Sequence, residues 1–505
     1  MNKTTFRTHS RSNKFAWLSA LLAGSCFMTF GAANALQATA AADNDAGKQS
    51  PPPAQPPRPL QLPKPTTYKM TNGMTVVMLE DHRVPFVTFQ LGIKSGDSCD
   101  PTTMPGLASV TADMLSEGTS TRTGKEIATE IDRIGGAVRA QTDPDFTIVA
   151  GSGLSKHSDS LFGIAADMTQ HPNFPEREFK LEKTNLLQEL TMKRTNPGFL
   201  ANERFHKVVF GNHPYATISP TPESVEKMTR QDLVNFHNTH YLPNLATLVV
   251  VGDFYTDKLK NLIDKDFGGW TSEQAPSMVS ASCPQLSCRT ICLVDRPGSV
   301  QSTVKIGNLG ITKNDPDYFA VMVANQILGG SANSRLFLNI REQKGYTYGA
   351  YSQFAPHIEP GYFTAGAEVR TPVTAPALKE FLYELGRIRT TPVSTSELTN
   401  AKNYLIGTFQ SGFETQANIS QRLLEQHLYN LPADYLQTYT DKVEAVQPED
   451  VKRVANKDID FDHLAITVVG DAKQIETDLR SFGPVEVYDQ SGKLVRHDDA
   501  EKKTL

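Results

Sequence analysis

Apolar residues along the chain occur in short continuous runs and in longer runs with helical spacing. The short runs at 76–79, 88–93 and 248–251 predict buried strands. The charged stretch 175–193 has the spacing of a single helix, and further helical patterns fill 106–193, between the second and third of these strands. We therefore expect an α+β layer in which helices cover one face of a sheet.

The chain also contains an internal repeat. Residues 244–253 and 463–471 are both near-continuous apolar runs that end in Gly-Asp, which is typical of a buried strand followed by a tight turn. A chain of 505 residues is too long for one hydrophobic core, so two copies of one fold are expected. We assign an N-terminal domain to 67–271, a linker rich in Ser, Pro, Ala and Gln to 272–289, and a C-terminal domain to 290–487.

The first 35 residues are typical of a cleaved secretory signal. Four basic residues precede an apolar run at 15–30, and Ala33-Asn34-Ala35 has the form of a cleavage site. A membrane helix and a lipoprotein signal ending at Cys26 are the alternatives. Residues 36–66 are then a Pro-rich linker and 488–505 a polar tail, and we expect a periplasmic or secreted chain with no stable membrane span.

The charge and the cysteines of the chain bear on its possible partners and on its cross-links. Without the signal the chain has 46 basic and 55 acidic residues, a balance of about −9 that argues against nucleic acid as a partner. Four cysteines remain, Cys99, Cys283, Cys288 and Cys292, and the last three lie within ten residues of one another. In an oxidising compartment a disulfide from Cys283 to Cys288 or to Cys292 is expected, with a zinc site as the weaker alternative because no histidine lies nearby in sequence.

Four motifs occur in order between residues 67 and 485. They are Thr71-Asn72-Gly73-Met74-Thr75-Val76-Val77, the segment 106–119, Gly211-Asn212-His213-Pro214-Tyr215, and the run 244–253. Together they resemble the pitrilysin/insulinase (inverzincin) family of zinc peptidases, in its shorter, processing-peptidase-like bacterial branch. The resemblance implies two homologous α/β-layer domains facing each other across a cleft.

The zinc-binding helix of that family is degenerate in this chain. Its His-x-x-Glu-His motif places two imidazoles and a general-base Glu on one helix face. The three positions hold Ser109, Ala112 and Asp113, and a Ser hydroxyl with a single carboxylate does not make a tetrahedral zinc site. The family's third ligand is a Glu about 76 residues further on, which corresponds to Glu189, with Glu182 two turns earlier on the same helix face. Two surface glutamates on a charged helix are the alternative interpretation.

A second family element is retained. Arg341 is followed seven residues later by Tyr348, like the Arg and Tyr that in the family hold the substrate at the zinc. A guanidinium and a phenol can bind a peptide carbonyl and stabilise the oxyanion formed on hydration. Packing roles for both residues are the alternative, and Tyr346 is the rival of Tyr348.

The resemblance therefore implies a subunit without zinc. Some relatives divide the zinc motif and the Arg/Tyr pair between two chains, and this chain has only the pair. We expect the non-zinc subunit of a heteromeric peptidase that is inactive alone, has no cofactor of its own, and acts on peptides with a homologous partner that carries the intact motif and zinc. An inactive peptide-binding or scaffold protein is the alternative, followed by a metallopeptidase that uses Ser109, Asp113 and Glu189 with another ion.

Overall fold

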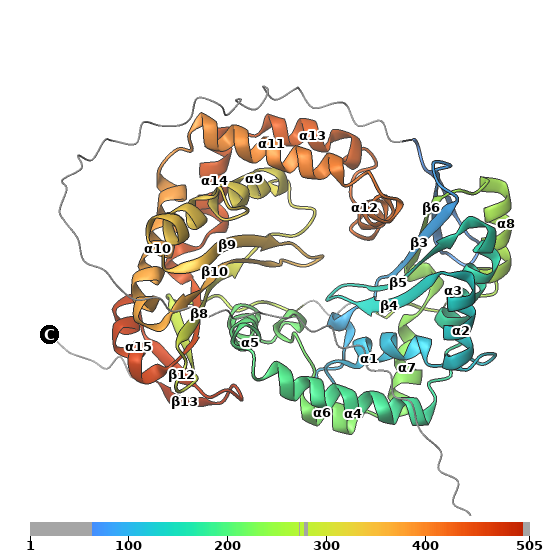
Figure 1. Ribbon diagram of the computed structural model, residues 1–505, viewed down its shortest axis with the longest axis horizontal. Helices are drawn as coiled ribbons and strands as arrows, with labels where there is room; N and C mark the ends of the chain where they lie inside the picture. The colour runs from blue at the N-terminus through green and yellow to red at the C-terminus, as the bar shows by residue number, and fades with distance from the viewer. Residues whose placement is uncertain (1–62, 272, 277–280, 498–505) are drawn as a thin grey trace, which may run out of the picture. The chain divides into compact units, whose positions relative to one another are not determined.

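The computed structural model of the protein describes residues 63–497, except 272 and 277–280 (Figure 1). The expected signal peptide and nearly all of the Pro-rich linker lie outside these residues. Two mixed sheets with flanking helices form the described part of the chain, which confirms the two-domain α+β architecture.

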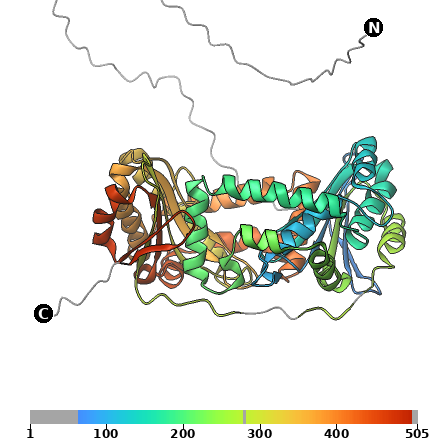
Figure 2. The ribbon, with the colours of Figure 1, turned by 90° about the horizontal axis from the view of Figure 1, so that it is seen from below.

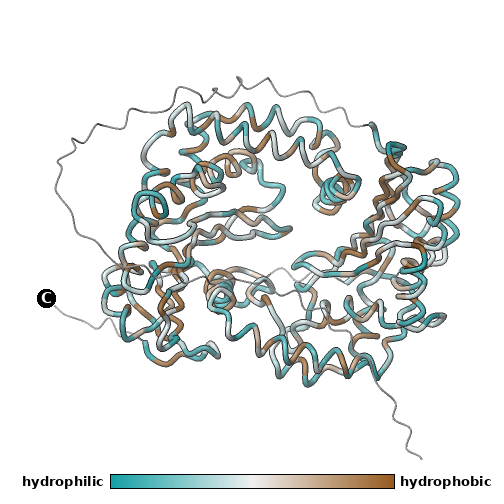
Figure 3. Tube along the Cα trace, viewed as in Figure 1, coloured by the Kyte–Doolittle hydropathy of each residue, from teal (hydrophilic) through white to brown (hydrophobic). Residues whose placement is uncertain are grey.

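The first sheet has six strands with β6 near its middle. β6 pairs in parallel with β2 and antiparallel with β3, and all of its residues are buried. Figure 3 shows this part of the sheet in the brown of hydrophobic residues. The predicted strands at 76–79, 88–93 and 248–251 are therefore confirmed. In spatial order the strands are β1 (Thr66–Lys69), β2 (Thr75–Glu80), β6 (Ala246–Gly252), β3 (Phe86–Ile93), β5 (Thr147–Leu154) and β4 (Ala137–Thr142).

The second sheet repeats this topology. Its central strand β11 pairs in parallel with β7 and antiparallel with β8, as β6 does with β2 and β3. The two Gly-Asp runs thus occupy equivalent places, which confirms the internal repeat. In spatial order the strands are β13 (Leu494–His497), β12 (Val485–Tyr488), β7 (Thr290–Asp295), β11 (Ala465–Gly470), β8 (Gln301–Leu309), β10 (Tyr362–Arg370) and β9 (Thr347–Ala355). The segment assigned to a polar tail therefore includes a strand, β13, although all four of its residues are exposed.

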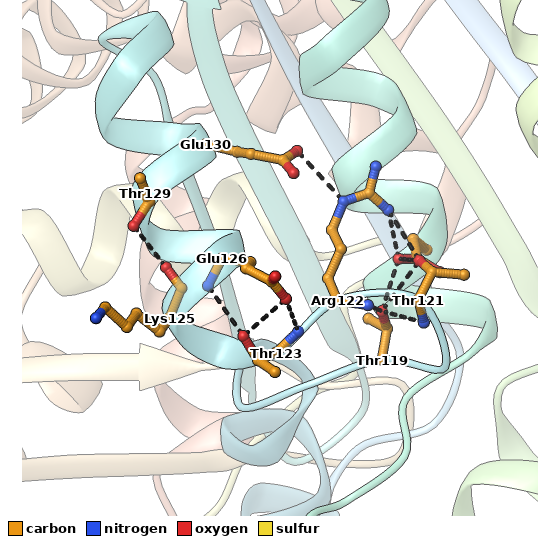
Figure 4. A network of polar contacts seen from close by, with 9 residues as sticks. Thr119, Thr121, Arg122, Thr123, Lys125, Glu126, Thr129 and Glu130 are labelled. Carbon is orange, nitrogen blue, oxygen red and sulfur yellow. Dashed lines mark hydrogen bonds and ion pairs between the residues drawn. The ribbon is translucent and has the colours of Figure 1, made fainter.

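Helices of the first half begin and end at recognisable signals. Thr123 forms a capping box with Glu126 at the start of α2, beside the Arg122 side chain (Figure 4). The Arg122 guanidinium donates a hydrogen bond to Asp167 at 2.6 Å. α4 begins after Pro175 and matches the helix predicted for 175–193; Figure 2 shows it as the long green helix. The helices are α1 (Leu107–Asp113), α2 (Gly124–Ile134), α3 (Ser158–Gln170), α4 (Glu176–Lys193), α5 (Pro197–Phe210), α6 (Pro222–Lys227), α7 (Arg230–His240) and α8 (Thr256–Phe267).

The second half also has helices around its sheet, and a π-helical turn, Phe337–Gln343, precedes β9. The helices are α9 (Tyr318–Leu328), α10 (Thr374–Thr390), α11 (Thr395–Ser411), α12 (Gln416–Leu428), α13 (Tyr435–Ala445), α14 (Pro448–Asp458) and α15 (Ala472–Leu479). None of the helices in the described ranges is long and apolar enough to cross a membrane.

Each half packs one of its helices on the sheet of the other. α12 lies against β3 and β6 of the first sheet, while α5 lies against β8 and β11 of the second. The α12 contact is apolar and close, since a Cβ placed on Gly92 of β3 would lie 2.7 Å from Leu428 and 3.0 Å from Leu424. Part of the apolar surface of each sheet is therefore covered by a helix of the other half, while a separate core of the first half is built from its own residues.

Neither expected disulfide is formed, because Cys99, Cys283, Cys288 and Cys292 are all free thiols. Cys292 is buried within β7, where its Sγ lies 3.8 Å from the Glu486 carboxylate, and Cys283 packs with the apolar cluster at the end of α5. Cys288 is exposed. The local structure therefore holds Cys283, Cys288 and Cys292 in three different environments.

Candidate functional site

The degenerate zinc positions line a cavity of about 480 Å³. Ser109 and Asp113 reach it from α1, Glu189 reaches it from α4, and residues 211–220 close another side. Three of the predicted positions are thus brought together. Ala112 is not among the lining residues, because its side chain is buried in the domain with 1% of its surface exposed.

Ser109 is held by a hydroxyl and carboxylate network. Its Oγ donates to Asp97 at 3.0 Å and lies 2.8 Å from the Thr142 hydroxyl, which itself donates to Asp97 at 2.8 Å. Burial raises the pKa of Asp97, and the two hydroxyl hydrogen bonds partly oppose that rise. The Ser109 oxygen is therefore engaged with protein groups and is not presented to a metal ion.

Asp113 is an acid with a strongly altered pKa. Asp113 lines the cavity and is exposed at its surface, although protein occupies much of the space around its carboxyl group. This partial removal from water, followed by the negative charges of Glu182, Glu189 and Asp97, raises the pKa of Asp113 to about 6. The position that would hold an imidazole ligand instead holds a carboxyl group that binds its proton more tightly than usual.

Glu189 and Glu182 lie near Asp113 but differ in their surroundings. Glu189 forms an i,i+4 ion pair with Lys193 at 2.7 Å, and 56% of its side chain is exposed. Glu182 is half-buried, and its pKa is raised by burial and then by Glu117 and Glu189. Glu189 therefore has both features: it pairs with Lys193 as a surface glutamate would, and it also lines the cavity.

The residues of this cavity do not fit a zinc ion. Zinc at a catalytic site takes three protein ligands, usually imidazole or thiolate with a carboxylate. The cavity offers a bonded hydroxyl at Ser109, a carboxyl of raised pKa at Asp113, and a carboxylate paired with Lys193 at Glu189. Across the described residues no group of three or more His, Cys, Asp or Glu side chains is arranged to hold a metal ion.

Sequence reasoning did not identify Asp97 or Asp100 as part of this site. Asp100 accepts hydrogen bonds from the backbone N–H groups of Gly106 at 2.5 Å and Ala108 at 2.7 Å, so it fixes the start of α1. Burial raises its pKa to about 7. Gly106 has a φ of +91° and lies against Pro220, where a Cβ would be 2.5 Å from the ring. A polar run before a helix was the only available signal, and it did not distinguish these residues from an ordinary loop.

Arg341 and Tyr348 lie on the second half and do not line the cavity. Arg341 belongs to the π-helical turn, pairs with the adjacent Glu342, and has its guanidinium 4.9 Å from the centre of the Phe337 ring. Tyr348 stands on β9, the edge strand of its sheet, with 91% of its surface exposed. Tyr346 is partly buried against the core. Tyr346 therefore packs against the core, whereas Tyr348 does not.

Comparisons with known proteins cover both halves. A model of the insulinase family (peptidase family M16) matches residues 75–222, and a model described as the peptidase M16 inactive domain matches residues 227–405. Among similar sequences, a protein of Bacillus subtilis described as the uncharacterized zinc protease YmxG is 27% identical over 69% of this chain and 84% of its own length. An uncharacterized zinc protease of Rickettsia felis is 26% identical over 77% of this chain and 93% of its own length.

Solved structures agree with the fold. The crystal structure of a peptidase M16 inactive domain from Pseudomonas fluorescens has a TM-score of 0.76 and 27% identity, and the match covers 80% of this chain and 98% of that one. A protease from Helicobacter pylori has a TM-score of 0.75 at 20% identity, covering 81% of this chain and all of that one.

Proposed function

We propose a function from one premise: this chain belongs to the insulinase (M16) family of peptidases. We infer that it is the non-zinc subunit of a heteromeric peptidase, in which a homologous partner carries an intact His-x-x-Glu-His motif with its zinc. Arg341 and Tyr348 of this chain then complete the partner's active site. The misfit of Ser109, Ala112 and Asp113 to zinc supports the division of labour.

The exposure of Tyr348 is the observation that carries this proposal. A tyrosine with 91% of its surface in solvent contributes little to the stability of β9, so its hydroxyl is free to meet a peptide or partner. Arg341 comes from a π-helical turn, a rare element that often occurs at functional sites. A guanidinium and a phenol donor can hold a substrate carbonyl and stabilise the developing oxyanion.

The proposed location is the periplasm or the cell exterior. The signal-like residues 1–35 support it. Fusing residues 1–35 to a reporter protein and locating the mature reporter by fractionation tests this part separately. A reporter kept in the cytoplasm with the segment uncleaved would contradict it.

The test of the shared site is a peptide-cleavage assay on this chain mixed with a homologue that has the intact motif, and the neighbouring genes are the first place to look for that homologue. Tyr348→Phe and Arg341→Ala should each lower turnover, with a loss on the order of 10²-fold to 10³-fold for a lost oxyanion donor. Size-exclusion chromatography checks that the complex still assembles.

Tyr351→Phe is the matched control, because Tyr351 is an exposed tyrosine on the same strand, three residues further on. It should leave turnover unchanged. Tyr346→Phe tests the rival tyrosine. Full turnover with both Tyr348→Phe and Arg341→Ala would contradict the shared site.

An inactive peptide-holding protein is the second candidate function. The cavity of about 480 Å³ persists beside the degenerate motif, and a cavity of this size suits a bound peptide side chain. This alternative expects peptide binding by the chain alone, measured by fluorescence anisotropy, with no gain in cleavage when the homologous partner is added.

A further inference from the structure

The π-helical turn that carries Arg341 is tied to α10 by a buried asparagine. Asn339 lies within the turn, with 6% of its surface exposed. Its Nδ2 donates to Glu384 at 2.9 Å and to Glu380 at 3.1 Å. The two glutamates are one turn apart on α10, so a single side chain of the π-helical turn is bound by two side chains of the neighbouring helix.

These two hydrogen bonds use both donors of the Asn339 side chain. A primary amide has two N–H groups, and each of them meets a carboxylate here. The Oδ1 atom has no hydrogen-bond partner among the described residues, and turning the amide over would place this oxygen against the two carboxylates. The acceptors therefore hold the amide in one orientation.

Each glutamate also has a cation beside it. Lys344, directly after the turn, pairs with Glu380 at 2.9 Å. Burial raises the pKa of Glu380, but the hydrogen bonds from Lys344 and Asn339 outweigh this effect and lower the pKa below its usual value. Glu384 is 2% exposed, and the Arg387 guanidinium lies 3.3 Å from it. A carboxylate buried this deeply is costly unless it is hydrogen-bonded, so Glu384 favours the form of the turn that brings Asn339 to it.

The π-helical form of the turn sets the direction of Arg341. The backbone N–H of Lys344 donates to the carbonyl of Asn339 at 3.0 Å, which is the five-residue spacing of a π-helix, and Arg341 lies between these two residues. One extra residue in a helical turn rotates the side chains that follow it by about 100°. In the observed form the Arg341 guanidinium lies over the Phe337 ring, whose centre is 5.6 Å from that of Tyr351 on β9.

We propose that Asn339 is a positioning residue for Arg341, which holds the π-helical turn in one register through Glu380 and Glu384. Asn339 acts by fixing the direction of the guanidinium and does not itself contact substrate. A buried polar network that is satisfied in one arrangement favours that arrangement over its alternatives. The consequence for catalysis rests on the proposed function of Arg341, whereas the effect on the turn does not.

Asn339→Asp tests the effect on the turn in the chain alone. The substitution keeps the shape of the side chain but replaces its two donors by a third carboxylate. Hydrogen–deuterium exchange of the Lys344 amide, resolved by fragmentation mass spectrometry, should become roughly tenfold faster or more, because hydrogen bonds to charged groups are lost. Asn339→Asp combined with Glu384→Gln exchanges the amide and the carboxylate between the two positions, so it should restore slow exchange.

Gln343→Glu is the matched control, because it makes the same change from amide to carboxylate at an exposed position of the same turn. It should exchange as the wild type does. Asn339→Ala, which removes the donors without adding a charge, takes the place of Asn339→Asp if circular dichroism shows that the latter does not fold. Exchange at the wild-type rate in the folded variant would overturn the proposal.

The mixed complex separates positioning from simple stabilisation. Asn339→Asp should lower turnover roughly tenfold or more, and the combination with Glu384→Gln should recover most of it. In an Arg341→Ala background Asn339→Asp should have no further effect, because no guanidinium is left to position. A loss as large without Arg341 as with it would overturn the positioning role. Unchanged turnover on Arg341→Ala alone would contradict the proposed function, while the exchange experiment would still decide the role of Asn339 in the turn.

Discussion

Three substitutions change the family's zinc helix in three different ways. Ser109 keeps a polar atom but commits it to Asp97, and Ala112 removes the general base and buries a methyl group in its place. Asp113 keeps a possible ligand type, but burial and the nearby carboxylates raise its pKa to about 6. Single-residue chemistry therefore accounts for the loss of the metal site without any change of fold.

The raised pKa of Asp113 predicts a pH-dependent stability. An acid that binds its proton more tightly in the folded state makes the fold less stable as pH rises from its ordinary pKa of 3.8 to about 6. Asp113→Asn should therefore stabilise the chain at pH 7.5. We expect about 1 kcal/mol, after discounting the shift because solvent reaches the side chain.

Urea unfolding of the wild type and Asp113→Asn at pH 3.5 and 7.5 checks this prediction. At the lower pH the gain should nearly vanish, since the carboxyl group is then protonated in both the folded and the unfolded state. A gain of equal size at both pH values would show that the charge of Asp113 is not its cause.

His82 predicts the opposite dependence. Its ring bonds Asp253 at 2.7 Å and Glu80 at 3.2 Å, and these two carboxylates raise the pKa of His82. The stabilisation is fully present below the ordinary pKa of 6.5 and is lost as pH rises through the higher folded value. His82→Gln should thus be less stable than the wild type at pH 5.5 and equal to it at pH 9, measured as urea midpoints. A deficit that stays constant over this range would contradict the ion-pair interpretation.

At the scale of elements, α1 and α4 still have the relative placement that a metal site needs. Ser109, Asp113 and Glu189 line one cavity, so Ser109→His with Asp113→His should restore zinc binding with Glu189 as the third ligand. Adding Lys193→Ala, which releases Glu189 from its 2.7 Å ion pair, should tighten it. Ala112→Glu is needed only for hydrolysis, and it places a charge at a buried position, so the triple mutant should be less stable.

Zinc content after dialysis, measured by mass spectrometry, checks the double mutant, and Glu189→Gln in the same background should remove the metal. The wild-type chain should hold no stoichiometric zinc at this site. A folded double mutant that binds no zinc would contradict the assignment of Glu189 as the third ligand position.

Much of the fold at this scale could be predicted from the sequence, because its strongest signals are local. The runs 76–79, 88–93 and 248–251 became β2, β3 and β6, since continuous apolar runs have few alternatives to a buried strand. Strand β13 was not predicted because its two adjacent apolar residues, Leu494 and Val495, form too short a run to indicate a strand, and both are exposed. The contact of Asp97 with Thr142 could not be predicted either, since it joins residues far apart in sequence. The disulfide prediction was wrong because the spacing of cysteines in the sequence does not show in which strand or loop each cysteine lies.

For the whole molecule, the exchange of α5 and α12 predicts a single unfolding transition. Trp270 is the one tryptophan in residues 36–505, and it is buried in the first half. Its fluorescence should therefore report the first half, while far-ultraviolet circular dichroism reports both. We expect the two probes to give the same urea midpoint, because each sheet needs a helix from the other half.

Leu428→Ala should lower both midpoints together. Leu428 belongs to the second half but packs on the first sheet, and loss of a buried leucine side chain costs about 2–5 kcal/mol. Leu338→Ala, at an exposed position of the second half, is the control and should change little. Separate transitions for the two probes would show that the halves unfold independently.

The position of α12 also sets the order of events during synthesis. The last strand of the first sheet, β6, ends at Gly252, but the helix that covers the sheet begins at Gln416, about 160 residues later. At ribosomal speeds of roughly 5–20 residues per second, α12 is synthesised on the order of 10 to 30 s after β6. The apolar face beside Gly92 is uncovered during this time. A nascent chain of this protein therefore exposes an apolar sheet face throughout that interval. We expect chaperones, or another nascent copy of the chain, to bind this face during those seconds.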